Sequence, residues 1–320
     1  MTQPLNYTPK AIADLLAYEC AGMSGTAAGL RYIADKLSIA EVFILRDHGQ
    51  LLDRTKPRPQ VPGVMFRPPF PVVALEFEAN PAEWDDAFYN PTRCSRRIAL
   101  AWEWQDDLPP PLKALQPPDM RPSVVVASIC YHDATGSWMP MGAACALEYD
   151  DVWQHEPVAS DFKAAMIQAG RLSKRVASEP GLSGTLVHLM PESVLLASRQ
   201  FGIAATLDSL GADLMDEVNA YTDLCYALAC KNVSTREHGA PKFLNRQRIK
   251  KGKLPLRGFH VLELNGGGEM PGARDSAGDR AGCRSHLRRG HIRRLGADRV
   301  TWVNSTVVRG RGFVDKVYAA

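Results

Sequence analysis

A run of arginines and histidines near the C-terminal end holds the side chains with the clearest chemistry. Within residues 284–295 these side chains are Arg284, Arg288, Arg289, Arg293, Arg294, His286 and His291. Guanidinium groups bind phosphate oxygens through paired hydrogen bonds. Two imidazoles on one phosphate could cleave RNA, one taking the 2′-hydroxyl proton and the other protonating the leaving oxygen. The run therefore predicts phosphate binding, and a metal-independent ribonuclease that uses His286 and His291 is an alternative.

The spacing of the two histidines argues against the catalytic alternatives. On a continuous strand, residues five apart point to opposite faces, so His286 and His291 converge only if Gly290 breaks the alternation. A zinc site of Cys283, His286 and His291 has suitable ligand types, but no second Cys/His pair follows at finger spacing. Polar donors that bind a phosphate or carbonyl oxygen need no such convergence. We therefore prefer that interpretation and predict neither a metal nor a cofactor.

A second cationic segment precedes this run. Its cations are Lys242, Arg246, Arg248, Lys250, Lys251 and Lys253. Phe243, Leu244 and Ile249 are its apolar anchors. Such a segment is either a solvated connection or a clamp that lies along phosphates and releases their counterions. The predicted nucleic-acid-binding residues are these six cations together with Arg288, Arg289, Arg293 and Arg294.

Charge is divided unequally along the chain. From Pro241 to Ala320 there are 18 Lys and Arg against 6 Asp and Glu; the whole chain has 38 against 35, which leaves 20 against 29 before Pro241. A basic terminal module on an acidic body is typical of proteins that bind a polyanion, most often nucleic acid. We predict an acidic body over residues 1–239 and a basic, β-rich module over 240–320, with DNA or RNA as the partner. The opposite charges also leave open a non-catalytic assembly or interaction protein, including a homo-oligomer.

The elements that must position these side chains mix helices and strands without regular alternation. Apolar residues at helical spacing predict helices from Thr8 onward and over about 26–37, 162–176 and 206–230. Apolar runs of strand length are 41–45, 72–77, 98–102, 123–130, 142–147, 184–189 and 258–264, and residues 291–308 predict a β-hairpin. Short connections favour antiparallel pairing. We therefore predict an α+β fold with a mixed, mainly antiparallel sheet and helices.

Composition excludes several classes of protein. Apolar residues make up 45% of the chain, as in folded globular proteins. No apolar run approaches the ~20 residues that span a bilayer. The chain begins without a secretory signal pattern and its seven cysteines are scattered, so we expect a cytoplasmic protein with free thiols and no membrane partner. The sequence holds no nucleophile elbow, zincin motif or dinucleotide fingerprint.

The cysteines of the body suggest little chemistry in the sequence. Cys130 and His132 lie two apart on a predicted strand and would share a face, but no third group is indicated to orient them. Cys94 has no histidine near it in the sequence and predicts no reaction. Cys225 and Cys230 lie on the predicted long helix, where we expect core thiols.

Several strings in the C-terminal third form a recognisable set. They are Cys230–Val233, Lys242–Arg246, Lys250–Leu256, Val261–Leu264, His286–Arg294 and Gly312–Tyr318. The most specific is the His-x-Arg-Arg-Gly-His string of residues 286–291. Over about residues 225–320 the set resembles uncharacterised proteins encoded by tailed phages and prophages. The resemblance implies a phage protein in a bacterial host cell, and it transfers no activity.

Overall fold

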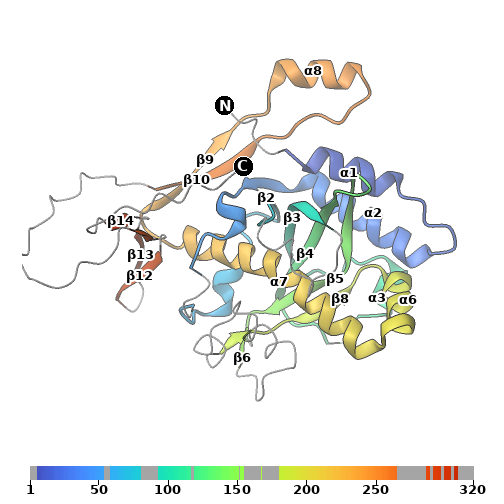
Figure 1. Cartoon of the computed structure of the whole chain (residues 1–320), viewed down its shortest axis with the longest axis horizontal. Helices are drawn as coiled ribbons and strands as arrows, with labels where there is room; N and C mark the ends of the chain where they lie inside the picture. Colours follow the sequence, from blue (N-terminus) through green and yellow to red (C-terminus); the bar gives the residue numbers. More distant parts are fainter. Residues whose placement is uncertain are drawn as a thin grey trace, which may run out of the picture.

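One eight-stranded sheet with helices packed on both faces forms the body of the protein (Figure 1). The computed structural model describes residues 6–53, 58–80, 93–116, 119–150, 152–154, 167 and 180–264, and the backbone of the strands at 286–288, 291–296, 299–303 and 306–308. The helix predicted at 162–176 lies outside the described residues except for Ile167.

Six α-helices and two 3-10 turns occur among the described residues. The helices are α1 (Thr8–Ala17), α2 (Ser24–Ile39), α3 (Pro110–Lys113), α6 (Pro191–Phe201), α7 (Ile203–Leu228) and α8 (Lys242–Lys250). The 3-10 turns are η1 (Asp47–Gly49) and η2 (Gly63–Phe66).

The strands fall into one large sheet and three two-stranded pairs. The large sheet contains β1 (Glu41–Ile44), β2 (Val72–Glu78), β3 (Cys94–Glu103), β4 (Ser123–His132), β5 (Ser137–Glu148), β8 (Thr185–His188), β9 (Val233–His238) and β10 (Phe259–Leu264). The pairs are β6 (Trp153–Gln154) with β7 (Gly181–Leu182), β11 (His286–Arg288) with β14 (Thr306–Val308), and β12 (His291–Gly296) with β13 (Arg299–Val303).

The strand order confirms the predicted fold class. The order is β8-β5-β4-β3-β2-β1-β10-β9, and only β1 pairs in parallel, with β2 on one side and β10 on the other. The remaining neighbours are antiparallel. Only the connection between β4 and β5, residues 133–136, is too short for a parallel crossover. The protein is therefore α+β with a mixed, mainly antiparallel sheet.

The sheet separates two apolar cores. Along β3, Ile98, Leu100 and Trp102 point to the face covered by α1 and α2, whereas Ala99 and Ala101 point to the face covered by α7. Full burial of a large apolar side chain stabilises the fold by ~1.5–3 kcal/mol. Because both faces are covered, the central strands are continuous apolar runs rather than alternating ones, which is why the sequence pattern identified them.

Helix α7 lies across one face of the sheet and confirms the strongest helix prediction, over 206–230. The predicted apolar stripe is buried along its length, at Leu210, Leu214, Val218, Tyr221 and Leu224. Burial at spacings of three and four residues is the mark of one helix face against a core.

The same helix holds the proline-rich segment that precedes β2. The Tyr221 hydroxyl donates to the carbonyl of Phe66 at 2.7 Å, and the Tyr226 hydroxyl donates to the carbonyl of Pro59 at 2.6 Å. The guanidinium of Arg58 lies 2.7 Å from the fully buried carboxylate of Asp223. A segment without regular backbone hydrogen bonds is therefore fixed by side chains of α7.

The start of α1 is capped by a carboxylate from a distant strand. Glu76 of β2 is fully buried and accepts hydrogen bonds from the backbone N–H groups of Tyr7 and Thr8, both at 2.8 Å, and from the Thr8 hydroxyl at 2.7 Å. Burial raises the pKa of Glu76, while these hydrogen bonds and the charge of Arg257 lower it. An anion at a helix N-terminus satisfies its unpaired N–H groups and its dipole.

Helix α2 approaches the chain before α6 so closely that glycine is required. A Cβ atom on Gly29 would lie 1.8 Å from the carbonyl oxygen of Leu189. One turn earlier, Glu192 accepts from the backbone N–H groups of Gly25 and Thr26 at 2.8 and 2.7 Å. Both N-terminal helices thus begin at a carboxylate that comes from elsewhere in the fold.

The C-terminal strands can be compared with the predicted boundary and the predicted hairpin. The predicted boundary at residues 239 and 240 falls between β9 and β10, which are paired neighbours in the main sheet. The hairpin predicted over 291–308 is present as β12 with β13, in which His291 faces Val303. Residues 306–308 of the predicted hairpin form β14, which pairs with β11.

We predict that Glu76→Ala lowers the free energy of unfolding by about 2–4 kcal/mol, because it leaves two buried N–H groups and a hydroxyl unpaired. Urea unfolding followed by circular dichroism measures the change. Glu78→Ala on the same strand removes an exposed carboxylate and should cost less than about 0.5 kcal/mol. Equal losses in the two variants would contradict the role of Glu76 as a cap.

Candidate nucleic-acid interface

The basic arm, residues 239–258, connects two neighbouring strands at the edge of the sheet. β9 and β10 pair over six residues, from Val233 with Leu264 to His238 with Phe259. The rings of His238 and Phe259 stack at a centroid distance of 4.9 Å where the arm begins. Figure 1 shows α8 projecting beyond the body at the end of this strand pair.

The sequence of the arm accounts for its helix. From Lys242 to Lys250 there is no glycine or proline, and Ile249 is the only β-branched residue. Gly252 ends the helix in the left-handed region, with φ of 66°, and the N–H of Lys253 donates to the carbonyl of Arg248 at 2.9 Å. Basic residues in the last turn also suit the negative end of the helix dipole.

Hydrogen bonds hold α8 to the returning chain. The side chain of Asn245 donates to the carbonyl of Leu256 at 2.8 Å and accepts from its N–H at 2.7 Å. The Arg248 side chain donates to the carbonyl of Leu254 at 2.9 Å. The helix and the returning chain therefore form one unit rather than a loose connection.

Arg257 fastens the base of this unit to the body. Its guanidinium donates to the carbonyl of Ala40 at 2.9 Å and to that of Ser38, at the end of α2. Its backbone exchanges two hydrogen bonds with the side chain of Asn6, at 3.0 and 3.2 Å. Arg257 is thus a structural cation, in contrast to the six cations nearer the tip.

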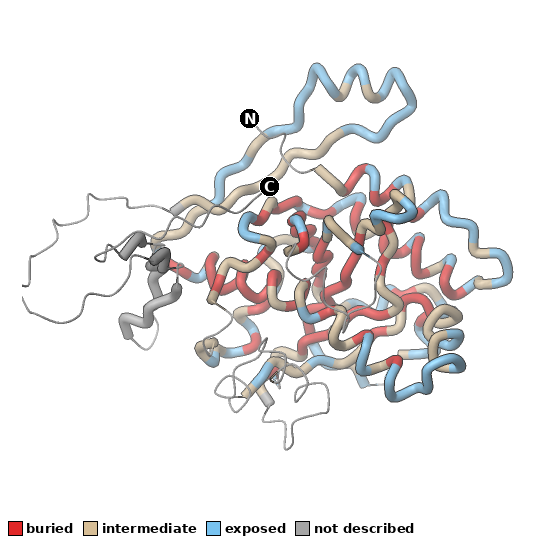
Figure 2. The backbone as a smooth tube through the Cα atoms, viewed as in Figure 1, coloured by how far each residue is buried: buried red, intermediate tan, exposed pale blue. Residues whose placement is uncertain are grey.

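Those six cations have no carboxylate near them in the sequence or among the described residues. From Gly239 to Leu262 there is no Asp or Glu. Within the described part of the chain, no ion pair involves Lys242, Arg246, Arg248, Lys250, Lys251 or Lys253. All are exposed except Arg248, which is intermediate, and Figure 2 shows the contrast with the buried sheet and α7.

Two cations of the body are placed differently. Arg58 and Arg97 are largely buried and lie 2.7 and 3.0 Å from the buried carboxylates of Asp223 and Glu217. Such pairs satisfy each other and leave little charge for a partner. Six cations without an ion pair lie within residues 242–253 of the arm, whereas the body cations that lack one among the described residues, such as Arg31 and Arg199, lie far apart in the sequence.

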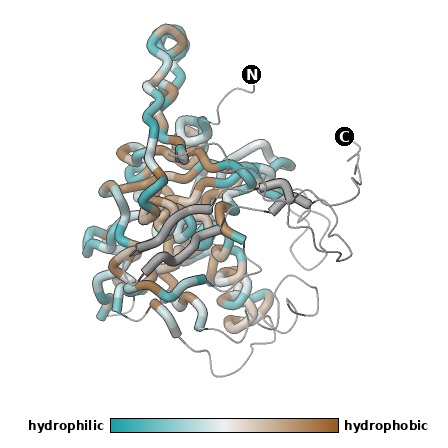
Figure 3. Tube along the Cα trace, turned by 90° about the vertical axis from the view of Figure 1, so that its left-hand side faces the viewer, coloured by the Kyte–Doolittle hydropathy of each residue, from teal (hydrophilic) through white to brown (hydrophobic). Residues whose placement is uncertain are grey.

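One face of α8 combines charge with exposed apolar side chains. Lys242, Arg246 and Lys250 follow each other at four-residue spacing and share a face. Phe243 and Ile249 flank them and are 75% and 61% exposed. Figure 3 shows hydrophilic and hydrophobic residues side by side on the projecting arm. This combination of cations with an aromatic ring can contact both phosphates and bases.

The remaining predicted site residues belong to the two-stranded pairs. Arg288 ends β11, and Arg293 and Arg294 lie in β12; Arg289 lies outside the described residues. His286 begins β11 and His291 begins β12, so the two histidines start strands of different pairs.

Other kinds of site find no support in the described part of the chain. No group of three or more His, Cys, Asp or Glu side chains there is arranged to hold a metal ion. None of the described helices is both long and apolar enough to cross a bilayer. Comparison with protein-family models, curated proteins and solved structures finds no match for this chain.

Sequence reasoning located the arm cations but missed the residues that position them. We expected a solvated connection or a phosphate clamp over 242–253 and predicted no helix there, whereas the structure has α8. The run of helix formers closed by Lys251 and Gly252 is a helix signal that could have been used. Asn245 contacts a residue 11 positions away, and Arg257 contacts one more than 200 positions away. No local sequence pattern indicates these contacts.

We predict that Asn245→Ala loosens the arm without unfolding the body. The variant loses both hydrogen bonds to Leu256, so amide hydrogens of α8 should exchange about tenfold faster while those of α7 keep their rates. Hydrogen–deuterium exchange with mass spectrometry measures both helices in one experiment. Gln247→Ala, an exposed change in the same helix, is the control and should leave both rates unaltered.

Proposed function

We propose that this protein binds nucleic acid through the basic arm, by contacts to phosphates rather than by reading bases. The observation that supports the proposal is the gathering of six cations on a projecting helix and its following turn, without an ion pair among the described residues. A cation already paired with a carboxylate gains little from a phosphate, whereas an exposed, unpaired one releases counterions when it binds.

The geometry of the arm favours contact with the sugar–phosphate backbone. Lys242, Arg246 and Lys250 span two turns of helix, a rise of about 12 Å at 1.5 Å per residue. That length matches several phosphates of a nucleic-acid strand. The proposal also includes the sequence-predicted contacts Arg293 and Arg294, and the phage context implied by the resemblance fits an accessory role. Ribonuclease activity is not part of the proposal, because His286 and His291 are five residues apart and would converge on one phosphate only if Gly290 breaks the strand alternation.

An assembly role is the second candidate, since the acidic body could attract the arm of another copy. The described arm cations form no ion pair with their own body. This leaves them available to an external anion of either kind. Nucleic acid is favoured over an acidic protein surface because the exposed ring of Phe243 lies beside the cations.

We predict that replacing Lys242, Arg246 and Lys250 together by Gln weakens binding to duplex DNA. Each lost phosphate contact should reduce the slope of log K against log salt by about 0.9, so the triple variant should lose about 2–3 in slope. Fluorescence anisotropy with a labelled oligonucleotide over a salt series measures it.

A matched variant separates the arm from net charge. Lys10, Arg67 and Arg93 lie on the body with side chains 51%, 56% and 57% exposed. Changing these three to Gln removes the same charge and should leave the slope near that of the native protein. Equal effects of the two variants, or native binding that is insensitive to salt, would reject the arm as the interface.

Substitution of Phe243 tests whether an unpaired base of a single strand stacks on the arm. If an unpaired base stacks on Phe243, Phe243→Ala should weaken binding to a single-stranded oligonucleotide by about 1–3 kcal/mol and leave duplex binding unchanged. Phe243→Trp keeps a stacking surface and should retain affinity. The same anisotropy assay with both substrates measures it, and equal losses on single strand and duplex would exclude stacking.

A further inference from the structure

A second polar cluster lies on the α7 face of the sheet. Cys94 at the start of β3 is paired with His132 at the end of β4, and a β-bulge follows between Cys94 and Arg96. Two residues before His132 on the same strand, Cys130 points to the same face and is paired with Arg97. Two thiols, an imidazole and a guanidinium therefore meet on two neighbouring strands.

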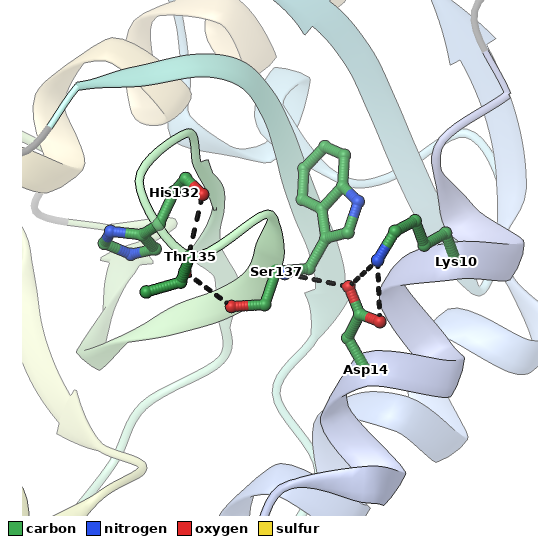
Figure 4. Close-up of polar contacts among 6 residues, drawn as sticks. Lys10, Asp14, His132, Thr135 and Ser137 are labelled. Atoms are coloured by element: carbon green, nitrogen blue, oxygen red, sulfur yellow. Dashed lines mark hydrogen bonds and ion pairs between the residues drawn. The ribbon is translucent and has the colours of Figure 1, made fainter.

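The His132 imidazole does not take part in the hydrogen bonds that Asp14 of α1 makes at the hairpin of β4 and β5. Asp14 of α1 accepts from the backbone N–H of Trp138 at 3.0 Å and from Lys10 at 2.6 Å. Figure 4 shows the His132 imidazole directed away from these groups. The ring therefore lies on the side where Cys94 is, and not on the side of Asp14 and Lys10.

The sulfur atoms have specific partners. The Cys94 Sγ atom lies 3.7 Å from Nδ1 of His132, within reach of a thiol hydrogen bond. The thiol of Cys130 is buried and hydrogen-bonds to Cys94. Its sulfur also lies 3.3 Å from the hydroxyl of Ser128, which is fully buried. Cys94 is the half-buried, more accessible member of the pair.

Charges around the pair favour a thiolate on Cys94. The hydrogen bond from Cys130 and then the positive charge of Arg97 lower the pKa of the Cys94 thiol, against burial and the charges of Asp133 and Glu217. The pKa of Cys130 is raised, first because it donates to Cys94 and then because it is buried. Arg97 is fixed by Glu217 of α7 at 3.0 Å and by Asp216 at 3.8 Å.

The other described cysteines lack these features. Burial raises the pKa of Cys145, Cys225 and Cys230, and the pKa of Cys20 is raised as well. Buried thiols without a cation or imidazole beside them are inert. Among the six described cysteines, Cys94 alone has its pKa lowered.

We propose that Cys94 is a nucleophilic thiol that reacts with hydroperoxides, that His132 carries the proton, and that Cys130 then closes a disulfide with Cys94. In the tautomer with its proton on Nε2, His132 takes the Cys94 thiol proton on Nδ1. With hydrogen peroxide, the sulfur bonds to one oxygen as the O–O bond breaks, and the proton goes to the departing oxygen, which leaves as water; an organic hydroperoxide releases an alcohol instead.

The second step uses the buried thiol. Cys94 is then a sulfenic acid, and the Cys130 sulfur attacks it; the S–O bond breaks and a second water leaves with the Cys130 proton. Two electrons pass in total from the two thiols to the peroxide. The bulge beside Cys94 interrupts the ladder at that point, which gives the backbone room for the two sulfurs to approach.

The full-length protein tests the proposal directly. It is treated with hydrogen peroxide, alkylated, digested and analysed by peptide mass spectrometry. We expect a Cys94–Cys130 linkage that dithiothreitol removes. In Cys130→Ser, dimedone should label Cys94 as a sulfenic acid instead. His132→Asn should slow Cys94 oxidation by at least about tenfold, because proton transfer by a positioned side chain contributes at least that much.

Two further measurements distinguish a reactive site from general exposure. The rate of Cys94 alkylation against pH should have a lower midpoint than that of Cys20, which lies in another part of the body. Cys20→Ser is the control and should leave Cys94 oxidation unchanged. The proposal is overturned if Cys94 is oxidised no faster than Cys20, or if a folded His132→Asn protein keeps the native rate of Cys94 oxidation. It is also overturned if Cys94 is oxidised to higher acids without any linkage to Cys130.

Discussion

The parallel pairing of β1 with β10 is the contact on which the place of the basic arm depends. It brings residues more than 200 positions apart into register, Phe43 beside His260. The rings of His260, Phe43 and Phe70 form one cluster, in which the His260 ring stacks on the other two at centroid distances of 5.0 and 5.4 Å. Arg257 adds hydrogen bonds to the carbonyls just before β1. These contacts make the arm an extension of the sheet rather than an appendage on a linker.

The buried charged groups of the body and the exposed cations of the arm differ in whether a group of the protein pairs with them. Inside the body, the buried carboxylates of Glu76, Glu217 and Asp223 each meet N–H groups or a guanidinium, as the low dielectric of the interior requires. On the arm the cations stay in water, where solvation replaces a counter-charge. The buried charged groups therefore hold helices and loops in place, whereas the exposed cations of the arm can bind a partner.

The two sites proposed for this protein follow from that division. The arm offers cations without partners, which suits a polyanion. The Cys94 cluster instead uses a buried ion pair, Arg97 with Glu217, to place a positive charge beside a half-buried thiol. The first site depends on exposure and the second on partial burial. The arm connects β9 to β10, and the Cys94 cluster lies on β3 and β4.

The sequence by itself determined the elements with strong local patterns. The apolar run of β4, the stripe of α7 and the α+β class were all predicted, because period-two and period-3.6 patterns reflect burial of one element against a core. The charge segregation likewise located the cations now found on the arm. These features depend on residues within one window of the chain, so local reasoning suffices for them.

Only the tertiary structure decided how those elements meet. It placed β10 beside β1 in the main sheet, because this pairing depends on backbone hydrogen bonds that composition does not record. It brought Cys94 to His132 across 38 positions through strand register and a bulge. It also joined Glu76 to the start of α1 across 68 positions. Contacts between distant residues are set by the register of strands and the packing of faces, and these are properties of the folded chain as a whole.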